Sequence, residues 1–150
     1  MKTQILAAAL VSALVLATPA AEAKIYLSRV NTAVTELTPT IMDVPLALGQ
    51  TSAQFVLAAR TRVAITFSSE CHARDGTGFV SINIVVDGIE IAPARGLDLG
   101  WCSHLDGFAA ASTTVSVGLA AGTHIVRVRA ILGGSTTSGA LDDSSLVVFD

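Results

Sequence analysis

The chain has 150 residues and a formal net charge of −3; 51% of its residues are hydrophobic and only 14% are charged. This balance excludes an intrinsically disordered chain and predicts a folded core. No segment clusters basic residues, so the sequence offers no electrostatic basis for binding nucleic acid.

The first 23 residues have the pattern of a secretory signal peptide. Lys2 supplies a positive start, residues 5–17 are almost entirely apolar, and residues 21–23 read Ala-Glu-Ala, with small side chains where a signal peptidase cleaves. The apolar stretch is shorter than the ~20 residues of a membrane span, and no membrane insertion is expected after cleavage. We therefore expect a secreted protein, periplasmic or extracellular, in which residues 24–150 form one domain.

Alternation of apolar and polar residues dominates the chain from residue 54 onwards, and no window after the leader has the spacing of a surface helix. Asp87-Gly88, between apolar neighbours, is a two-residue hairpin signal. The predicted strands, in chain order, cover residues 25–34, 41–46, 53–58, 61–72, 80–86 leading through the hairpin to 89–93, 108–119, 124–132 and 141–149.

About eight strands at this spacing, with no helix to cross between them, predict an all-β fold. We expect a two-sheet antiparallel β-sandwich of the jelly-roll type rather than a seven-stranded immunoglobulin-like domain. The alternation also assigns the core, which is expected to contain Val63, Ile65, Phe67, Ile82, Ile84, Val86, Val126, Val128, Leu146 and Val148.

The two cysteines, Cys71 and Cys102, lie 31 positions apart in the exported part of the chain. Oxidising compartments favour a disulfide between them, worth roughly 3–4 kcal/mol by loop closure. The alternative is a zinc site that adds His72 and His104. Because adjacent strand residues point to opposite faces, a Cys71–His72 chelate would need an irregular backbone, and we expect no metal or other cofactor.

The loop of residues 93–106 is the longest stretch without periodicity in the strand region, and it contains the only tryptophan. Long loops in compact domains are usually functional or mobile. An aromatic plate with polar neighbours suits a sugar or another flat ligand. The candidate ligand-binding residues are therefore Trp101, His104, Asp98, Asp106, His72 and Asp75. The alternative is that Trp101 simply packs over the disulfide.

Catalytic motifs are absent from the sequence, which has no Gly-x-Ser-x-Gly, His-Glu-x-x-His or phosphate-binding glycine loop. Glu70 with Asp75 or Asp106 could form a carboxylate pair for glycoside hydrolysis, although acidic residues at strand ends are ordinarily solvated. The pair at residues 142–143 could bind calcium if another loop supplied oxygen ligands, but it is more typical of a polar turn. We expect no catalytic residues.

Four segments, at residues 62–67, 84–88, 119–128 and 140–146, carry a resemblance to known families. Their order resembles bacterial secreted jelly rolls, both C1q/TNF-like domains and galactose-binding-like carbohydrate-binding modules. The segments Ser-Ser-Glu-Cys-His and Trp-Cys-Ser-His also resemble a group of uncharacterised exported bacterial proteins. The sugar-binding modules usually present two aromatic residues and an Asn in their loops, and this chain departs from that pattern because it offers one Trp and places Asn83 in a strand.

Together these patterns predict a secreted, non-catalytic β-sandwich that serves as an interaction or surface-structural module. The expected partners are a second copy of the chain, as the resemblance to C1q/TNF-like domains implies, or a surface protein or glycan. A small carbohydrate-binding domain that uses the Trp101 loop is the first alternative. The second is a hydrolase or metal-dependent enzyme with an unrecognised site.

Overall fold

Strands make up the regular structure of the part of the chain that the computed structural model describes, which is residues 23–75, 77–92, 100–103 and 106–150. These residues form no helix long and apolar enough to cross a membrane. The strands are β1 (Ile25–Asn31), β2 (Thr35–Leu37), β3 (Ile41–Asp43), β4 (Ala53–Leu57), β5 (Thr61–Ala73), β6 (Phe79–Val86), β7 (Ile89–Glu90), β8 (Ala109–Leu119), β9 (Gly122–Gly133) and β10 (Gly139–Phe149).

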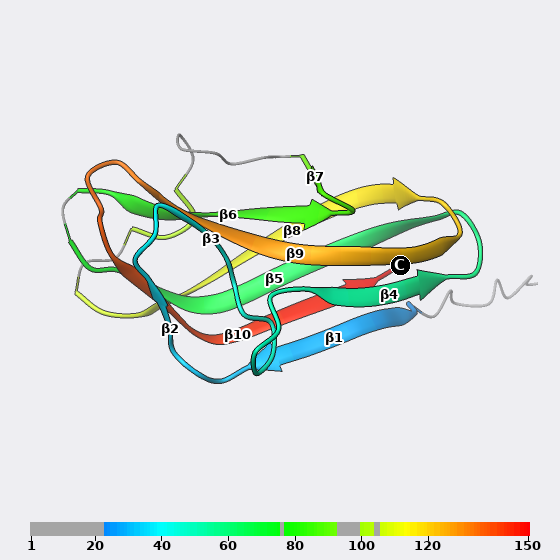
Figure 1. Ribbon diagram of the computed structural model, residues 1–150, viewed down its shortest axis with the longest axis horizontal. Helices are drawn as coiled ribbons and strands as arrows, with labels where there is room; N and C mark the ends of the chain where they lie inside the picture. Colours follow the sequence, from blue (N-terminus) through cyan, green and yellow to red (C-terminus); the bar gives the residue numbers. More distant parts are fainter. Residues whose placement is uncertain (1–22, 76, 93–99, 104–105) are drawn as a thin grey trace, which may run out of the picture.

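Two antiparallel sheets pack face to face (Figure 1). The first sheet has the order β1-β10-β5-β8, with β2 also beside β10; the second has the order β3-β9-β6-β7, with β4 also beside β9. β1 and β2 follow one another along β10, and β3 and β4 along β9, so each pair acts as one interrupted strand. Counted in this way, eight strands pair first with last, second with seventh, third with sixth and fourth with fifth. This is the jelly-roll arrangement, and it confirms the predicted fold class.

The core between the sheets is the one that the alternation predicts. All ten predicted core residues are at most 2% exposed. In β5, for example, Val63, Ile65 and Phe67 are fully buried while Arg62 and Glu70 are exposed on the opposite face. Alternate side chains of a strand point to opposite faces, so β5 has an inner apolar face and an outer polar face, as expected for antiparallel sheets.

The break between β1 and β2 departs from the continuous strand predicted over residues 25–34. The side chain of Asn31 is buried at the end of β1, and its Oδ1 accepts a hydrogen bond from the backbone N–H of Ala33. Its Nδ2 donates to the carbonyl oxygen of Pro45 at 3.3 Å. Because these bonds replace strand pairing, the chain turns at residues 32–34 and resumes as the short strand β2, which the sequence pattern does not predict.

Two other predicted features have clear outcomes. The hairpin at Asp87-Gly88 is confirmed: both residues have positive φ, 52° and 85°, as in a type I′ turn.

The expected disulfide is confirmed as well, between Cys71, near the end of β5, and Cys102. Cys102 forms a bridge with Val80 of β6. The disulfide therefore joins the first sheet to a segment held on the second.

Candidate functional site

Trp101, the predicted aromatic plate, lies against the core. Its backbone N–H and that of Cys102 donate to the carbonyl oxygen of Val80. Its ring centroid lies 5.8 Å from that of the fully buried Phe67, and its side chain is only partly exposed. Among the described residues, the buried indole Nε1 has no hydrogen-bond partner. This placement favours the packing alternative for Trp101.

Asp75, another predicted ligand-binding residue, holds the loop before β10. Its carboxylate accepts hydrogen bonds from the hydroxyl and the backbone N–H of Thr137 and from the N–H of Ser138. These bonds, above all the one from the Thr137 hydroxyl, hold the pKa of Asp75 below its ordinary value. The carboxylate thus has a structural use that does not require a ligand.

The structure describes two of the other predicted site residues, His72 and Asp106. The imidazole of His72 packs edge-on against the ring of Phe108, with the centroids 5.5 Å apart. Asp106 is exposed. Asp98 and His104 lie outside the described residues.

Metal chemistry finds little support in the described part of the chain. Cys71 and Cys102 are joined in the disulfide, so neither sulfur is available as the thiolate ligand of the alternative zinc site. No group of three or more His, Cys, Asp and Glu side chains among the described residues is arranged to hold an ion. The acidic pair at 142–143 lies in a β-bulge, where Asp142 Oδ1 accepts a hydrogen bond from the N–H of Asp143.

A buried histidine and an aspartate form a hydrogen-bonded pair that sequence reasoning did not find. His124 Nδ1 lies 2.7 Å from Asp87 Oδ2, and His124 Nε2 lies 3.0 Å from the carbonyl oxygen of Ala120. Both partners are acceptors, so a ring that makes both bonds carries two N–H groups and a positive charge. The bond to Asp87 raises the pKa of His124, and the bond from His124 lowers the pKa of Asp87.

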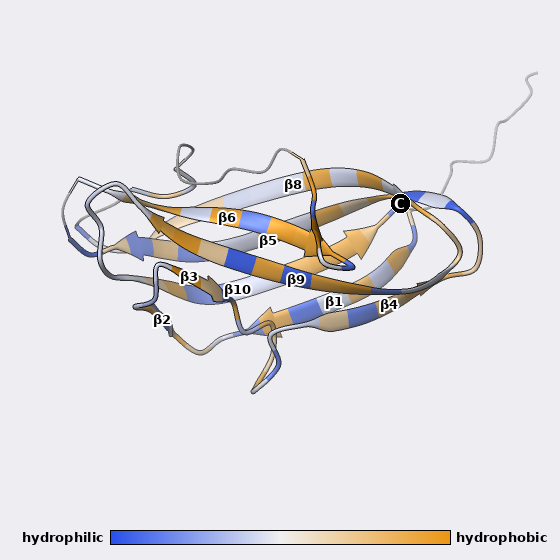
Figure 2. Ribbon diagram, turned by 45° about the horizontal axis from the view of Figure 1, so that its top comes forward, coloured by the Kyte–Doolittle hydropathy of each residue, from blue (hydrophilic) through white to orange (hydrophobic). Residues whose placement is uncertain are grey.

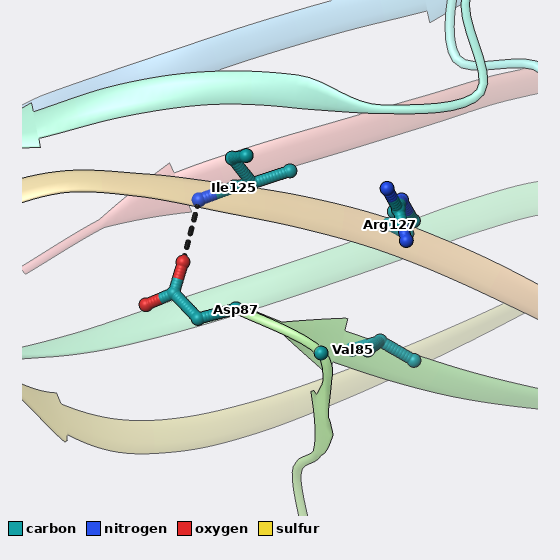
Figure 3. A pocket seen from close by; sticks show the side chains of 5 residues that line it. Val85, Asp87, Ile125 and Arg127 are labelled. Carbon is teal, nitrogen blue, oxygen red and sulfur yellow. Dashed lines mark hydrogen bonds between the residues drawn. The ribbon is translucent and has the colours of Figure 1, made fainter.

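Next to this pair is a hollow of about 320 Å³ on the outer side of the second sheet. It is lined by Val85, Asp87, Gly88, Ile125 and Arg127, and Figure 3 shows the hydrogen bond from the N–H of Ile125 to Asp87. Both carboxylate oxygens of Asp87 are thus engaged, one by His124 and one by Ile125. The hollow therefore offers a ligand the side chain of Arg127 but no free carboxylate.

The same side of the second sheet carries a network of ion pairs. Asp43 of β3 lies 3.5 Å from Arg129 and 3.9 Å from Arg127, and Arg129 also contacts Glu90 of β7 at 3.1 Å. These contacts tie β3, β9 and β7 together across the sheet.

A second hollow, of about 520 Å³, is strongly polar and lies beside β1 and β4. Its lining includes Arg29, Gln50, Gln54, Thr51 and Ser52, whose side chains carry guanidinium, amide and hydroxyl groups. These groups are suited to hydroxyl- and carboxylate-bearing ligands.

The outer face of the first sheet is different in character, since its centre carries no charge. We call this surface the uncharged face. By strand register it consists of Ser28 and Val30 of β1, Ser145 and Val147 of β10, Ala64, Thr66 and Ser68 of β5, and Ser112, Thr114 and Ser116 of β8. In Figure 2 most of β8 is pale, whereas β9 of the second sheet carries strongly hydrophilic segments.

Comparisons with known proteins give no family for this chain. No family model and no curated protein matches it. Among solved structures it is similar to a crystal structure of dimeric latent PorU from Porphyromonas gingivalis, with 14% sequence identity and a TM-score of 0.40. The match covers 87% of this chain but only 14% of that chain. A similarity of this degree supports no inference about function.

Proposed function

We propose that this protein is an exported, non-catalytic β-sandwich that binds a macromolecular partner through the uncharged face. One observation carries the proposal: the centre of this face is uncharged and consists mainly of serine, threonine and alanine side chains, with Val30 and Val147 beside them. Charged residues are common on solvated surfaces, and their depletion is one compositional mark of the core of an interface. The leader pattern and the buried disulfide are consistent with a periplasmic or extracellular location.

Several side chains that could take part in catalysis have structural contacts in the described structure, and this supports a non-catalytic role. Asp75 holds a loop, Asp87 holds His124, and both cysteines form the disulfide. Each of these side chains thus has a structural purpose, and none is paired with a nucleophile or a second free carboxylate as acyl transfer or glycoside hydrolysis would require.

Site-specific cross-linking in the producing cell tests the proposal. A photoreactive residue at Ser112 or Ser116 on the uncharged face should give a protein cross-link, whereas one at Thr123, on the outer side of the second sheet, should not. Equal labelling at all three positions, or none at any, would contradict the proposal.

A second candidate function is the binding of a small sugar, and the polar hollow beside Arg29 is the observation that favours it. On an array of neutral and carboxylated glycans, Arg29→Ala should lose binding to carboxylated sugars while Trp101→Ala keeps it. The reverse result would move the site to the Trp101 loop, and a silent array would contradict sugar binding at either place.

A further inference from the structure

We propose that the partner of the uncharged face is the same face of a second copy of this chain, with the strands of the two copies antiparallel. This inference rests on the proposed function, because it names the partner of the surface described there. It follows from the order of side chains on β5 and β8.

The outward-facing residues of these two strands are arranged almost symmetrically about the Thr66–Thr114 pair. Along β5 the face presents a basic, a small, a threonine, a small and an acidic residue, which are Arg62, Ala64, Thr66, Ser68 and Glu70. Opposite them on β8 lie Gly118, Ser116, Thr114, Ser112 and Ala110. If the direction of the strands is reversed about this pair, each small residue takes the position of another small residue. Arg62 and Glu70 exchange positions.

This symmetry allows the two copies to be related by a twofold axis that passes through the Thr66–Thr114 pair. The axis lies in the plane of the interface and is perpendicular to the strands. It places Arg62 over the partner's Glu70 twice, once from each copy, as an isologous interface requires. No ion pair within the described part of the chain engages either Arg62 or Glu70. An axis parallel to the strands would instead place arginine over arginine, so the charges select the antiparallel arrangement.

Neighbouring charges mostly follow the same polarity. Lys24 and Arg60 lie towards the Arg62 end of the sheet, and Asp142 is the register partner of Glu70 at the other end, where Arg74 and Glu36 form an ion pair of their own. Asp150 is the exception at the basic end, where its carboxylate accepts hydrogen bonds from the backbone N–H of Lys24 and from the hydroxyl of Tyr26.

Covering the centre of the uncharged face carries a reduced penalty, because most of the hydroxyl groups there already have hydrogen-bond partners. Thr66 Oγ1 and Thr114 Oγ1 share a hydrogen bond of 2.8 Å, and so do Ser68 Oγ and Ser145 Oγ. Satisfied polar groups can be buried with a small penalty, and small side chains let two sheets approach closely.

The area of the interface follows from the size of the face. Four strands about 4.8 Å apart, each contributing about nine residues at ~3.3 Å, give several hundred Å² per copy. This is below the ~800 Å² of a standard stable interface, so we expect a concentration-dependent dimer.

Sedimentation equilibrium of the purified protein tests the inference, between roughly 5 and 500 µM. We expect a monomer–dimer equilibrium in this range. Arg62→Glu or Glu70→Arg alone should weaken dimerisation at least about tenfold, because each places like charges together. An equimolar mixture of the two variants should restore it, because the unlike chains then pair opposite charges at both contacts. A mixture that stays monomeric overturns the antiparallel arrangement.

Thr114→Lys places two lysines on the axis and should abolish the dimer. Thr123→Lys is the matched control, since it adds the same charge to an exposed threonine on the outer side of the second sheet. Unchanged melting temperatures show that the variants are folded. A wild-type protein that is monomeric at every concentration overturns the inference. If the Ser112 probe then cross-links a different protein in the cell, the proposed function stands; if it cross-links nothing, both fail.

Discussion

His124 Nδ1 lies 2.7 Å from Asp87 Oδ2, and this contact ties the β6–β7 turn to β9. Asp87 occupies the first position of the turn, and its second oxygen accepts the N–H of Ile125 in β9. The other ring nitrogen of His124 reaches the carbonyl oxygen of Ala120, just before β9. One ion pair therefore fixes two chain reversals at one end of the sandwich.

This pair predicts that stability depends on pH. The pKa of folded His124 is raised above 6.5, so its contribution is complete below pH 6.5 and is lost as the pH rises through the folded value. The pKa of folded Asp87 is lowered below 3.8, so its contribution is complete above pH 3.8 and is lost as the pH falls through the folded value. The pair should stabilise the fold most between these limits.

Urea unfolding at pH 5 and pH 8 measures this effect. The wild-type protein should lose more free energy of unfolding between these two pH values than Asp87→Asn, a variant that keeps a residue tolerant of positive φ in the turn. Equal losses in the two proteins would show that the pair does not couple to folding.

Truncation of Phe67 should have a large effect on stability. Phe67 is fully buried and lies against Trp101, so Phe67→Ala leaves a cavity and should cost about 3–5 kcal/mol. Loss of this neighbour should also change the fluorescence of Trp101. Phe108→Ala is the control, since Phe108 is 42% exposed and should cost less. Similar melting temperatures for wild type and Phe67→Ala would contradict the assigned facing of β5.

The fold could be predicted because alternation directly encodes which side of a strand is buried. Val63, Ile65 and Phe67 show this in β5, where the pattern is unbroken. The pattern fails where a side chain replaces backbone pairing. Asn31 gives no periodic signal, yet its hydrogen bonds end β1 and allow β2 to start.

The candidate sites were harder to predict, because they depend on which residues from distant segments meet. Asp87 and His124 are 37 positions apart, and nothing in either local sequence indicates their contact. Trp101 carries an ambiguous signal, since a lone tryptophan in a loop can either stack against a ligand or pack over the hydrophobic core. The uncharged face did leave a signal in the sequence. Every second residue of β8, from Ala110 to Gly118, is small and uncharged. The register with β5 places these residues beside the outward-facing side chains of β5, on the uncharged face.

The disulfide should contribute substantially to stability. Cys71 and Cys102 close a loop with a sequence separation of 31, for which chain entropy predicts about 3–4 kcal/mol. The double variant Cys71→Ser/Cys102→Ser should lower the free energy of unfolding by about this amount. The wild type unfolded under reducing conditions is the parallel measurement and should show a similar loss. A double variant as stable as the oxidised protein would mean that the Val80–Cys102 bridge alone secures this segment.

Hydrogen exchange can decide whether the carboxylate of Asp75 is structural. In Asp75→Ala the backbone N–H groups of Thr137 and Ser138 lose their acceptor, so both should exchange faster while the amides of the β5–β10 ladder keep their protection. Asp106→Ala removes an exposed carboxylate and should leave both amides unchanged.

Because the pKa of Asp75 is lowered, the wild-type loop should keep its protection from exchange until the pH falls below the ordinary aspartate value of 3.8. If Asp75→Ala leaves both amides protected, the remaining bond from Thr136 Oγ1 to the carbonyl oxygen of Asp75 is sufficient to hold the loop. The carboxylate would then be free for the ligand-binding role that the sequence suggests.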